Sequence, residues 1–165
     1  MDIREAVAED WDTIWPFFRE IITTQETYTY DPELTFEQAR AIWMSASSSP
    51  LARTTVAVDA EGKVLASANM YPNRPGPGAH VASASFMVDA AARGQGVGRA
   101  LCQDMIDWAD RTGFRSIQFN AVVESNTGAV KLWQSLGFAI IGTVPEAFLS
   151  PTQGYVGLHI MHRHL

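Results

Sequence analysis

The chain has 165 residues and a formal net charge of −6, which is unfavourable for binding a nucleic-acid backbone, and we expect one domain over residues 1–165. Apolar residues make up 47% of the chain, an ordinary globular composition, and no stretch reaches the roughly 18 apolar residues of a transmembrane helix. Because the first residues also lack the apolar core of a signal peptide, we expect a cytoplasmic protein with neither nucleic acid nor membrane as its partner.

The first half of the chain predicts two helices among short strands. A helix starting near Asp10 or Asp12 carries an apolar stripe, although Pro16 is expected to disturb it because proline fits only the first helical turn. Thr35 and Gln38 resemble a capping box at the start of a second helix. The expected elements are a strand over residues 3–6, the first helix, a polar and aromatic loop over 23–32, a helix over 35–44, and a hairpin with strands over 54–59 and 64–71.

The second half changes from strand–turn–strand to strand–helix–strand. A loop rich in proline and glycine over residues 72–78 leads into an extended run over 79–88. Asn126 is expected to cap a short helix that ends at Gly137. The other expected elements are a helix over 97–112 and strands over 116–123, 138–144 and 155–162. This order fits a mixed sheet with helices on both faces.

A glycine-rich turn, Arg93-Gly94-Gln95-Gly96-Val97-Gly98-Arg99-Ala100, lies between an expected strand and an expected helix. The first backbone N–H groups of a helix have no helical acceptor, and the peptide dipoles add positive potential there. Glycines let a phosphate group approach this backbone closely, and the two arginines add charge. The alternative is a tight turn with no ligand.

The spacing narrows the class of phosphate ligand. A Walker loop is excluded because no Gly-Lys-Ser/Thr sequence follows the turn. The dinucleotide fingerprint, started at Gly94, has Arg99 where its third glycine belongs. Glu124, near the end of the next strand, imitates the acidic ribose ligand of that fold, so an NAD-dependent dehydrogenase remains an alternative.

Two elements together resemble the GNAT superfamily of N-acetyltransferases. The first is the R/Q-x-x-G-x-G/A motif, matched by Arg93, Gly96 and Gly98. The second is an asparagine, a short helix and a Leu-Tyr-x-x-x-Gly-Phe ending, matched from Asn126 to Phe138. The order of elements over residues 1–162 also looks like that of the family. The resemblance implies an α/β (α+β) fold with a mixed, mostly antiparallel sheet of about 6–7 strands and a splayed central pair.

The resemblance also implies acetyl-CoA as cosubstrate and assigns residues to it. The strand with Phe86, Met87 and Val88 would splay from residues 119–122 to admit the pantetheine arm. The Val88 N–H would polarise the thioester carbonyl as an oxyanion donor. Asn126 would bind the arm while also capping its helix. The pyrophosphate would be held by Arg93 and by the backbone of Gln95, Gly96, Val97, Gly98, Arg99 and Ala100.

Trp133 departs from the family pattern, which commonly has tyrosine there as the acid for the departing thiolate. An indole N–H donates a hydrogen bond but cannot act as an acid near neutral pH. The other interpretation of Trp133 is an aromatic side chain packed under the sheet. Its presence puts the general acid in doubt rather than the family.

The acceptor amine must reach the thioester as a neutral nucleophile, so a proton acceptor is needed. Glu26 is the first candidate, and Glu124 and His80 are alternatives. Asn73 and Asn120 resemble positions in members that acetylate proline analogues and related small amino acids, although Asn120 could equally be a buried amide with internal partners. The expected substrate-binding residues are Glu26, Thr27, Tyr28, Asn73 and Asn120.

Metal and thiol chemistry are not expected. His159 and His162 point to opposite faces of a strand, and His162 and His164 share a face only at the end of the chain. Cys102 is the single cysteine and lies mid-helix among apolar residues, which does not indicate a nucleophile.

The sequence therefore predicts direct transfer of acetyl from acetyl-CoA to the amine of a small molecule, an amino acid or analogue being one candidate. A non-catalytic acyl-CoA-sensing module is the alternative from another class. Analogy within the superfamily suggests a homodimer.

Overall fold

The computed structural model describes residues 1–45 and 49–165, and a seven-stranded sheet runs through them in the order β1-β2-β3-β4-β5-β7-β6. Neighbouring strands are antiparallel except for β4 and β5, which are parallel. The strands are β1 (Asp2–Glu5), β2 (Arg53–Val58), β3 (Val64–Pro72), β4 (Val81–Val88), β5 (Ser116–Val123), β6 (Ala139–Ser150) and β7 (Gly154–His164). The mixed, mostly antiparallel sheet predicted from the sequence is confirmed.

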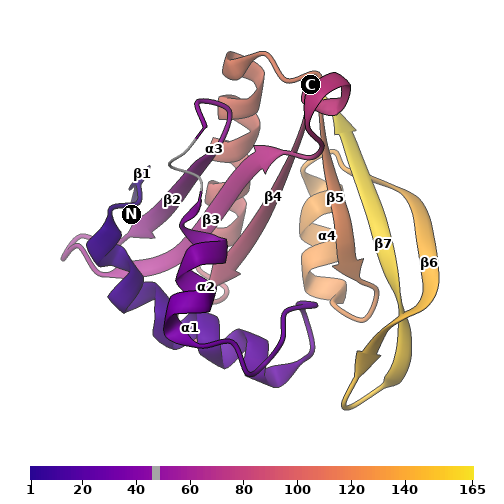
Figure 1. The fold of residues 1–165 in the computed structure, drawn as a ribbon, viewed down its shortest axis with the longest axis horizontal. Coiled ribbons are helices and arrows are strands. Elements are labelled where there is room, and N and C mark those ends of the chain that lie inside the picture. The colour runs from indigo at the N-terminus through magenta and orange to yellow at the C-terminus, as the bar shows by residue number, and fades with distance from the viewer. Residues whose placement is uncertain (46–48) are drawn as a thin grey trace.

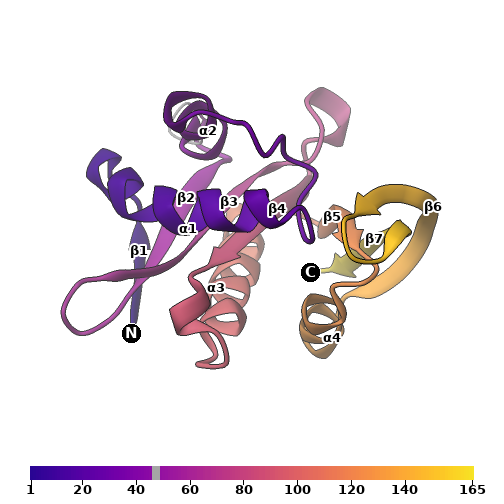
Figure 2. The same ribbon diagram turned by 90° about the horizontal axis from the view of Figure 1, so that it is seen from below.

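Helices cover both faces of this sheet, as predicted. Figure 2 shows α1 (Trp11–Thr24) and α2 (Phe36–Trp43) on one face and α3 (Val97–Thr112) and α4 (Thr127–Ser135) on the other. Single 3-10 turns precede α1, β4 and α3, at Ala8–Asp10, Gly76–Gly78 and Ala90–Ala92. The Thr35 capping box forms as expected, since its hydroxyl accepts from the Gln38 N–H at 3.3 Å.

Two hydrophobic cores lie on the two faces of the sheet. In β2, Val56 and Val58 belong to the core under α1 and α2, while Ala57 between them belongs to the core under α3. This division follows from the alternation of side chains along a strand. The neighbouring positions under α3 on β3 are also alanines, Ala66 and Ala68, both fully buried. Their small side chains leave room for α3 to pack close to the sheet.

β4 and β5 separate soon after they meet. They pair only at Val81–Ser116 and Ala82–Ile117, and the rest of each strand has no partner on that side. Figure 1 shows the two strands diverging from the edge of the sheet near the C-terminus. The predicted splay is therefore present, and it opens a gap in the middle of the sheet.

Two expectations about the elements were wrong. α1 runs unbroken through Pro16. Pro16 and Asp12, one turn apart, both lie on the exposed side of α1, where water can replace the hydrogen bond that proline removes. The last two strands are longer than the predicted 138–144 and 155–162, because they pair with each other far beyond the end of β5.

Candidate functional site

The gap between β4 and β5 holds a cleft of about 660 Å³. Its walls come from the loop after α1, from β3, β4 and β5, and from the first turns of α3 and α4. The glycine-rich turn borders one end, and Tyr28, Tyr30 and Tyr71 lie at the other. The glycine-rich turn and the motif that begins at Asn126 therefore line the same cleft.

The turn before α3 presents backbone donors to this cleft. Gly94 and Gly96 have φ of +78° and +80°, a region that favours glycine, and Gly96 is the N-cap of α3. The first helical hydrogen bond runs from the Ala100 N–H to the Gly96 carbonyl at 3.0 Å. The N–H groups of Val97, Gly98 and Arg99 therefore precede the helical ladder and are free for an anion.

The side chains around this turn have different surroundings. Arg93 is exposed and lines the cleft. The Arg99 guanidinium donates to the Ser135 hydroxyl on α4 at 2.5 Å, and the Gln95 amide donates to the Ala91 carbonyl at 3.0 Å. The Val97 side chain is buried in the core. Val97 can therefore contact a ligand only through its backbone.

The free edge of β4 faces the gap at alternate residues. The Asn73 N–H donates to the Val81 carbonyl at 2.7 Å, which identifies the odd-numbered residues of β4 as those hydrogen-bonded to β3. The backbone groups of Phe86 and Val88 therefore point into the gap, and the role of the Val88 N–H as an oxyanion donor stays a prediction. Met87 is a correction: its backbone faces β3, its side chain is fully buried in the core under α1, and it does not line the cleft.

Tyr28 occupies part of this free edge. Its hydroxyl donates to the Phe86 carbonyl at 2.5 Å and accepts from the Phe86 N–H at 3.0 Å. Burial raises the pKa of the Tyr28 hydroxyl, which therefore stays neutral. The sequence predicted Tyr28 as a substrate-binding residue but gave no signal for this contact.

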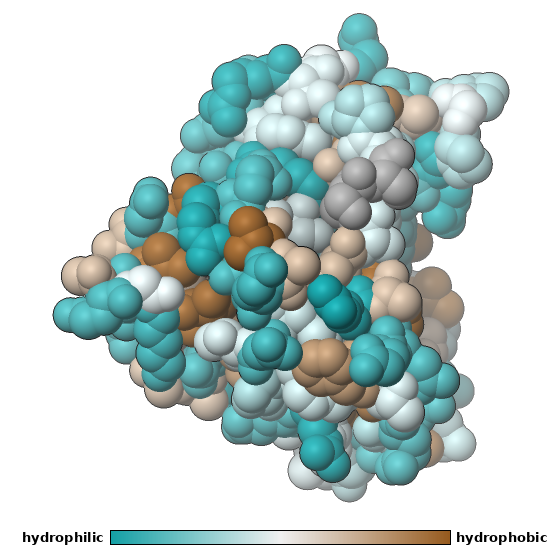
Figure 3. All heavy atoms as spheres, turned by 60° about the vertical axis from the view of Figure 1, so that its left-hand side comes forward, coloured by the Kyte–Doolittle hydropathy of each residue, from teal (hydrophilic) through white to brown (hydrophobic). Residues whose placement is uncertain are grey.

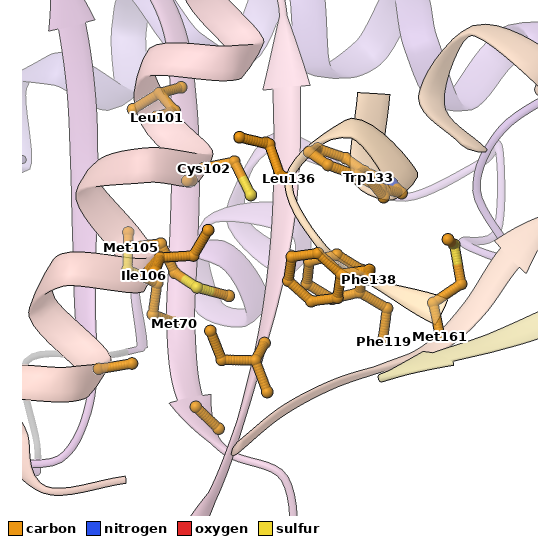
Figure 4. Packing of buried hydrophobic residues seen from close by; sticks show 14 of the residues in the cluster. Met70, Leu101, Cys102, Met105, Ile106, Phe119, Trp133, Leu136, Phe138 and Met161 are labelled. Atoms are coloured by element: carbon orange, nitrogen blue, oxygen red, sulfur yellow. The ribbon is translucent and has the colours of Figure 1, made fainter. Parts of the chain in front are cut away.

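Trp133 forms the apolar side of the cleft. Its ring lies 5.1 Å from Phe86 and 5.3 Å from Phe119 between centroids, and only 8% of the residue is exposed. Figure 4 shows Trp133 above the rings of Phe119 and Phe138, which stack at 4.4 Å. Within residues 1–45 and 49–165 the indole N–H has no hydrogen-bond partner. This arrangement fits the interpretation of Trp133 as a packed aromatic side chain.

Asn126 caps α4 and borders the cleft. Its side-chain oxygen accepts from the Ala129 N–H at 3.3 Å. The NH₂ end of the same amide is left for a ligand, which is compatible with both roles predicted for Asn126.

Asn73 and Asn120 meet beside the end of the cleft where the three tyrosines lie. The Asn120 amide donates to the Asn73 side-chain oxygen at 2.6 Å, and Gln118 donates to Asn120 at 2.9 Å. Asn120 is exposed and not the buried amide considered from the sequence, because it shares with Gln118 the face of β5 opposite to the buried Phe119. Thr27 and Asn120 line the cleft, and Asn73 reaches it through Asn120.

Glu26 lies outside the cleft lining and is tied to the β6–β7 turn. Its carboxylate accepts from the hydroxyls of Ser150 and Thr152, both at 2.7 Å. These bonds, the one from Ser150 first, lower the pKa of Glu26, which makes it a weaker base. This placement favours an anchoring role, and the catalytic role of Glu26 stays a prediction.

The structure gives no support to the other residues considered as a base, a metal ligand or a nucleophile. The Glu124 carboxylate accepts from the Gly157 N–H at 2.8 Å. His159 shares a hydrogen bond of 2.8 Å with the Thr143 hydroxyl. Cys102 is buried, and burial raises the pKa of its thiol to about 12, which leaves it without nucleophilic thiolate. Among the described residues no group of three or more His, Cys, Asp or Glu side chains could hold a metal ion.

The described helices include none with the length and apolar character needed to cross a membrane.

Known proteins share both the sequence pattern and the fold. The family model described as Acetyltransferase (GNAT) family matches residues 12–138. N-acetyltransferase aca1 of Schizosaccharomyces pombe is 32% identical over 111 residues, which are 67% of this chain and 53% of that protein, so the chain spans about half of this relative.

Two further proteins match over most of their length. The putative phosphinothricin acetyltransferase YwnH of Bacillus subtilis is 31% identical over 149 residues, 88% of each chain. The structure of a GCN5-related N-acetyltransferase from Kribbella flavida is 76% identical, has a TM-score of 0.97, and covers 99% of this chain and 97% of its own.

Proposed function

The chain belongs to the acetyltransferase (GNAT) family and is an acetyltransferase, and we propose that it moves acetyl from acetyl-CoA directly to the amine of a small molecule. One observation carries this proposal. The free N–H groups at the start of α3 and the free edge of β4 open into the same cleft. That combination suits a molecule with an anionic diphosphate end and an extended arm that contains amide groups.

The residues present fit the diphosphate and the arm of acetyl-CoA. The N–H groups of Val97, Gly98 and Arg99 would hold the diphosphate, with Arg93 adding charge. A Cβ built at Gly96 meets nothing within 4 Å, so the backbone there is open to a close approach. The Val88 backbone and the Asn126 amide would pair with the arm in place of a strand.

Direct acetyl transfer requires few catalytic groups from the protein. The amine nitrogen attacks the thioester carbonyl carbon, the carbon–sulfur bond breaks, the thiolate leaves, and the nitrogen gives its proton to a base or to water. The Val88 N–H would donate to the carbonyl oxygen, where negative charge develops, and this is the oxyanion type of stabilisation. No covalent acyl-enzyme is needed, and the buried Cys102 offers no nucleophile for one.

The acceptor would bind at the end of the cleft where the three tyrosines lie, which we call the acceptor end. A small polar amine fits this end better than a long charged chain does. The groups at this end are the hydroxyls and amides of Thr27, Tyr28, Tyr30, Tyr71 and Asn120, which are neutral. The match to a putative phosphinothricin acetyltransferase supports a small-molecule acceptor. The net charge of −6 argues against an acidic polymer as partner.

The test is CoA release with a panel of small amines, preceded by thermal unfolding with acetyl-CoA or with NAD. We expect acetyl-CoA to raise the Tm and NAD to leave it unchanged, and at least one amine to give turnover. Stabilisation by NAD alone would favour the dehydrogenase. Stabilisation by acetyl-CoA without turnover on any amine would favour the acyl-CoA-sensing module.

We also propose a homodimer that uses the β6–β7 hairpin. Large exposed hydrophobic residues gather there, namely Ile140, Ile141, Val144, Leu149 and Tyr155. The face seen in Figure 3 is mainly hydrophilic, with scattered hydrophobic areas. Sedimentation of the chain and of an Ile141→Glu variant tests this assignment, because a dimer held by the hairpin should dissociate in the variant.

A further inference from the structure

Tyr28 ends the open part of the β4 edge. A tyrosine hydroxyl has one donor and acceptor lone pairs, and the contacts of Tyr28 use it in both directions on the backbone of Phe86. In this way the side chain takes the place of a missing neighbouring strand. Val88 faces the same gap two residues further along, and no side chain of the described residues caps it. The edge is therefore open at Val88 and closed at Phe86.

The ring of Tyr28 is held in this position by its neighbours. It stacks on Tyr30, with 5.5 Å between centroids and 4° between planes. Tyr30 in turn stacks on Phe18 at 5.8 Å, and Phe18 is fully buried in the core under α1. Moving Tyr28 out of the gap therefore breaks two hydrogen bonds and one ring contact.

The direction in which an acyl group would point also follows from the chain. The turn that offers diphosphate donors comes after Val88 in the sequence, so a molecule bound there would run back along β4 from Val88 toward Phe86. We propose that Tyr28 limits the length of the acyl group and makes the enzyme selective for acetyl. This inference rests on the proposed binding of acetyl-CoA in the cleft.

The distances along the strand leave room for only a short acyl chain. An antiparallel strand rises about 3.4 Å per residue, so the N–H groups of Val88 and Phe86 lie about 7 Å apart. With the thioester carbonyl at Val88, the acetyl methyl fits before Tyr28, and each additional carbon–carbon bond extends the chain by at most about 1.5 Å. A butyryl chain would reach the Tyr28 hydroxyl and have to displace it.

Displacement is unfavourable because an apolar chain cannot replace the hydroxyl. The Phe86 N–H and carbonyl would then be buried without partners, which is more unfavourable than the burial of two methylene groups is favourable. The selectivity therefore depends on hydrogen bonds to the backbone as well as on the volume of the ring.

Calorimetry with CoA, acetyl-CoA and butyryl-CoA tests the proposal without relying on turnover. The wild-type chain is expected to bind butyryl-CoA at least about tenfold more weakly than acetyl-CoA. Tyr28→Ala should bring the two Kd values within about threefold, with the Kd of CoA unchanged. Tyr28→Phe keeps the ring and removes only the hydroxyl, so it should also lower the preference.

Tyr155→Phe is the matched control, since it removes the hydroxyl of an exposed tyrosine that does not line the cleft, and its acyl preference should match the wild type. Equal binding of both acyl-CoAs by the wild type would overturn the proposal. So would an unchanged preference in folded Tyr28→Ala, or in Tyr28→Phe if the alanine variant does not fold. Failure of the wild type to bind any of the three ligands would overturn the proposed function, and this inference with it.

Discussion

The Ser150 hydroxyl donates a hydrogen bond of 2.7 Å to the Glu26 carboxylate, joining the loop after α1 to the tip of the β6–β7 hairpin. Thr152 donates a second bond of 2.7 Å to the other oxygen of the same carboxylate. Since both oxygens are engaged and the pKa of Glu26 is lowered, we expect Glu26→Gln to reduce kcat by less than about tenfold, short of the 10²–10⁴-fold of a lost general base. Steady-state kinetics from pH 6 to 9 measure this. A hundredfold loss of kcat that varies with pH would show that Glu26 acts as the general base.

The same carboxylate gives a prediction about stability and pH. A carboxyl group whose folded pKa is lowered stabilises the protein above its unfolded pKa, and this stabilisation is lost as pH falls through the folded pKa. The difference in free energy of unfolding between the wild type and Glu26→Gln should therefore be constant near neutral pH and vanish in acid, below the ordinary range of a glutamate. Urea unfolding at several pH values checks this, and a difference that persists in acid would contradict it.

Asn120→Ala and Asn73→Ala are expected to raise the KM of the acceptor amine far more than that of acetyl-CoA. Each substitution removes the 2.6 Å bond between the two amides, which stand beside the acceptor end. The double variant should be little worse than either single one, because one shared contact is lost in all three. If the KM of acetyl-CoA rises instead and that of the amine does not, the pair belongs to the cofactor side.

Gly98 offers a cleaner test of the anion turn than Gly96. Gly96→Val is still expected to abolish acetyl-CoA binding, but its φ of +80° means that a branched side chain there also strains the backbone. Gly98 has ordinary helical geometry, and a Cβ there meets Leu132 at 3.5 Å and Val88 at 3.7 Å, which are normal contacts. Gly98→Ala should therefore bind acetyl-CoA nearly as the wild type does.

Gly98→Val places additional methyl groups in the cleft and should weaken binding by at least about tenfold, or roughly 1.4 kcal/mol. Calorimetry on both Gly98 variants, with circular dichroism as the check on folding, gives the comparison. Equal affinity of the valine and alanine variants would mean that the diphosphate does not approach this turn.

The local parts of the site could be predicted from the sequence. The glycine turn and the Asn126 cap depend on residues within one turn of each other, and such patterns can be found in a single sequence. The splay was also expected, but only through the resemblance of these two motifs to a family. Periodicity alone does not show that β4 and β5 part after two pairs.

The contacts between distant segments could not be predicted. Tyr28 and Phe86 are 58 residues apart, and nothing in either neighbourhood marks them as partners. The exposure of Asn120 depends on whether a helix covers its face of β5, and the sequence of β5 itself does not show this. The family resemblance predicts Met87 as a cofactor residue together with Phe86 and Val88, whereas alternate residues of a strand face opposite ways and the Met87 side chain lies in the core under α1.

Trp133→Phe is expected to lower kcat by less than about tenfold, in the range of one lost neutral hydrogen bond or a modest packing defect. Trp133 contacts Phe86 and Phe119 on the apolar side of the cleft, and phenylalanine preserves an aromatic ring there. The indole N–H cannot supply a proton near neutral pH, so its removal takes no acid from the reaction.

No acid is required at this position, because the leaving group is a thiolate. Thiols ionise near pH 8.5 in free cysteine, so the thiolate is a tolerable leaving group and water can protonate it afterwards. The measurement is kcat against pH for the wild type and Trp133→Phe, with calorimetry of acetyl-CoA and circular dichroism as controls. Trp133→Tyr is the matched variant, since it restores the phenol common in the family, and it should raise kcat only if protonation of the thiolate limits turnover. A loss beyond about a thousandfold in Trp133→Phe, with folding and acetyl-CoA affinity intact, is the size of a missing general acid and would show that Trp133 takes part in the chemistry.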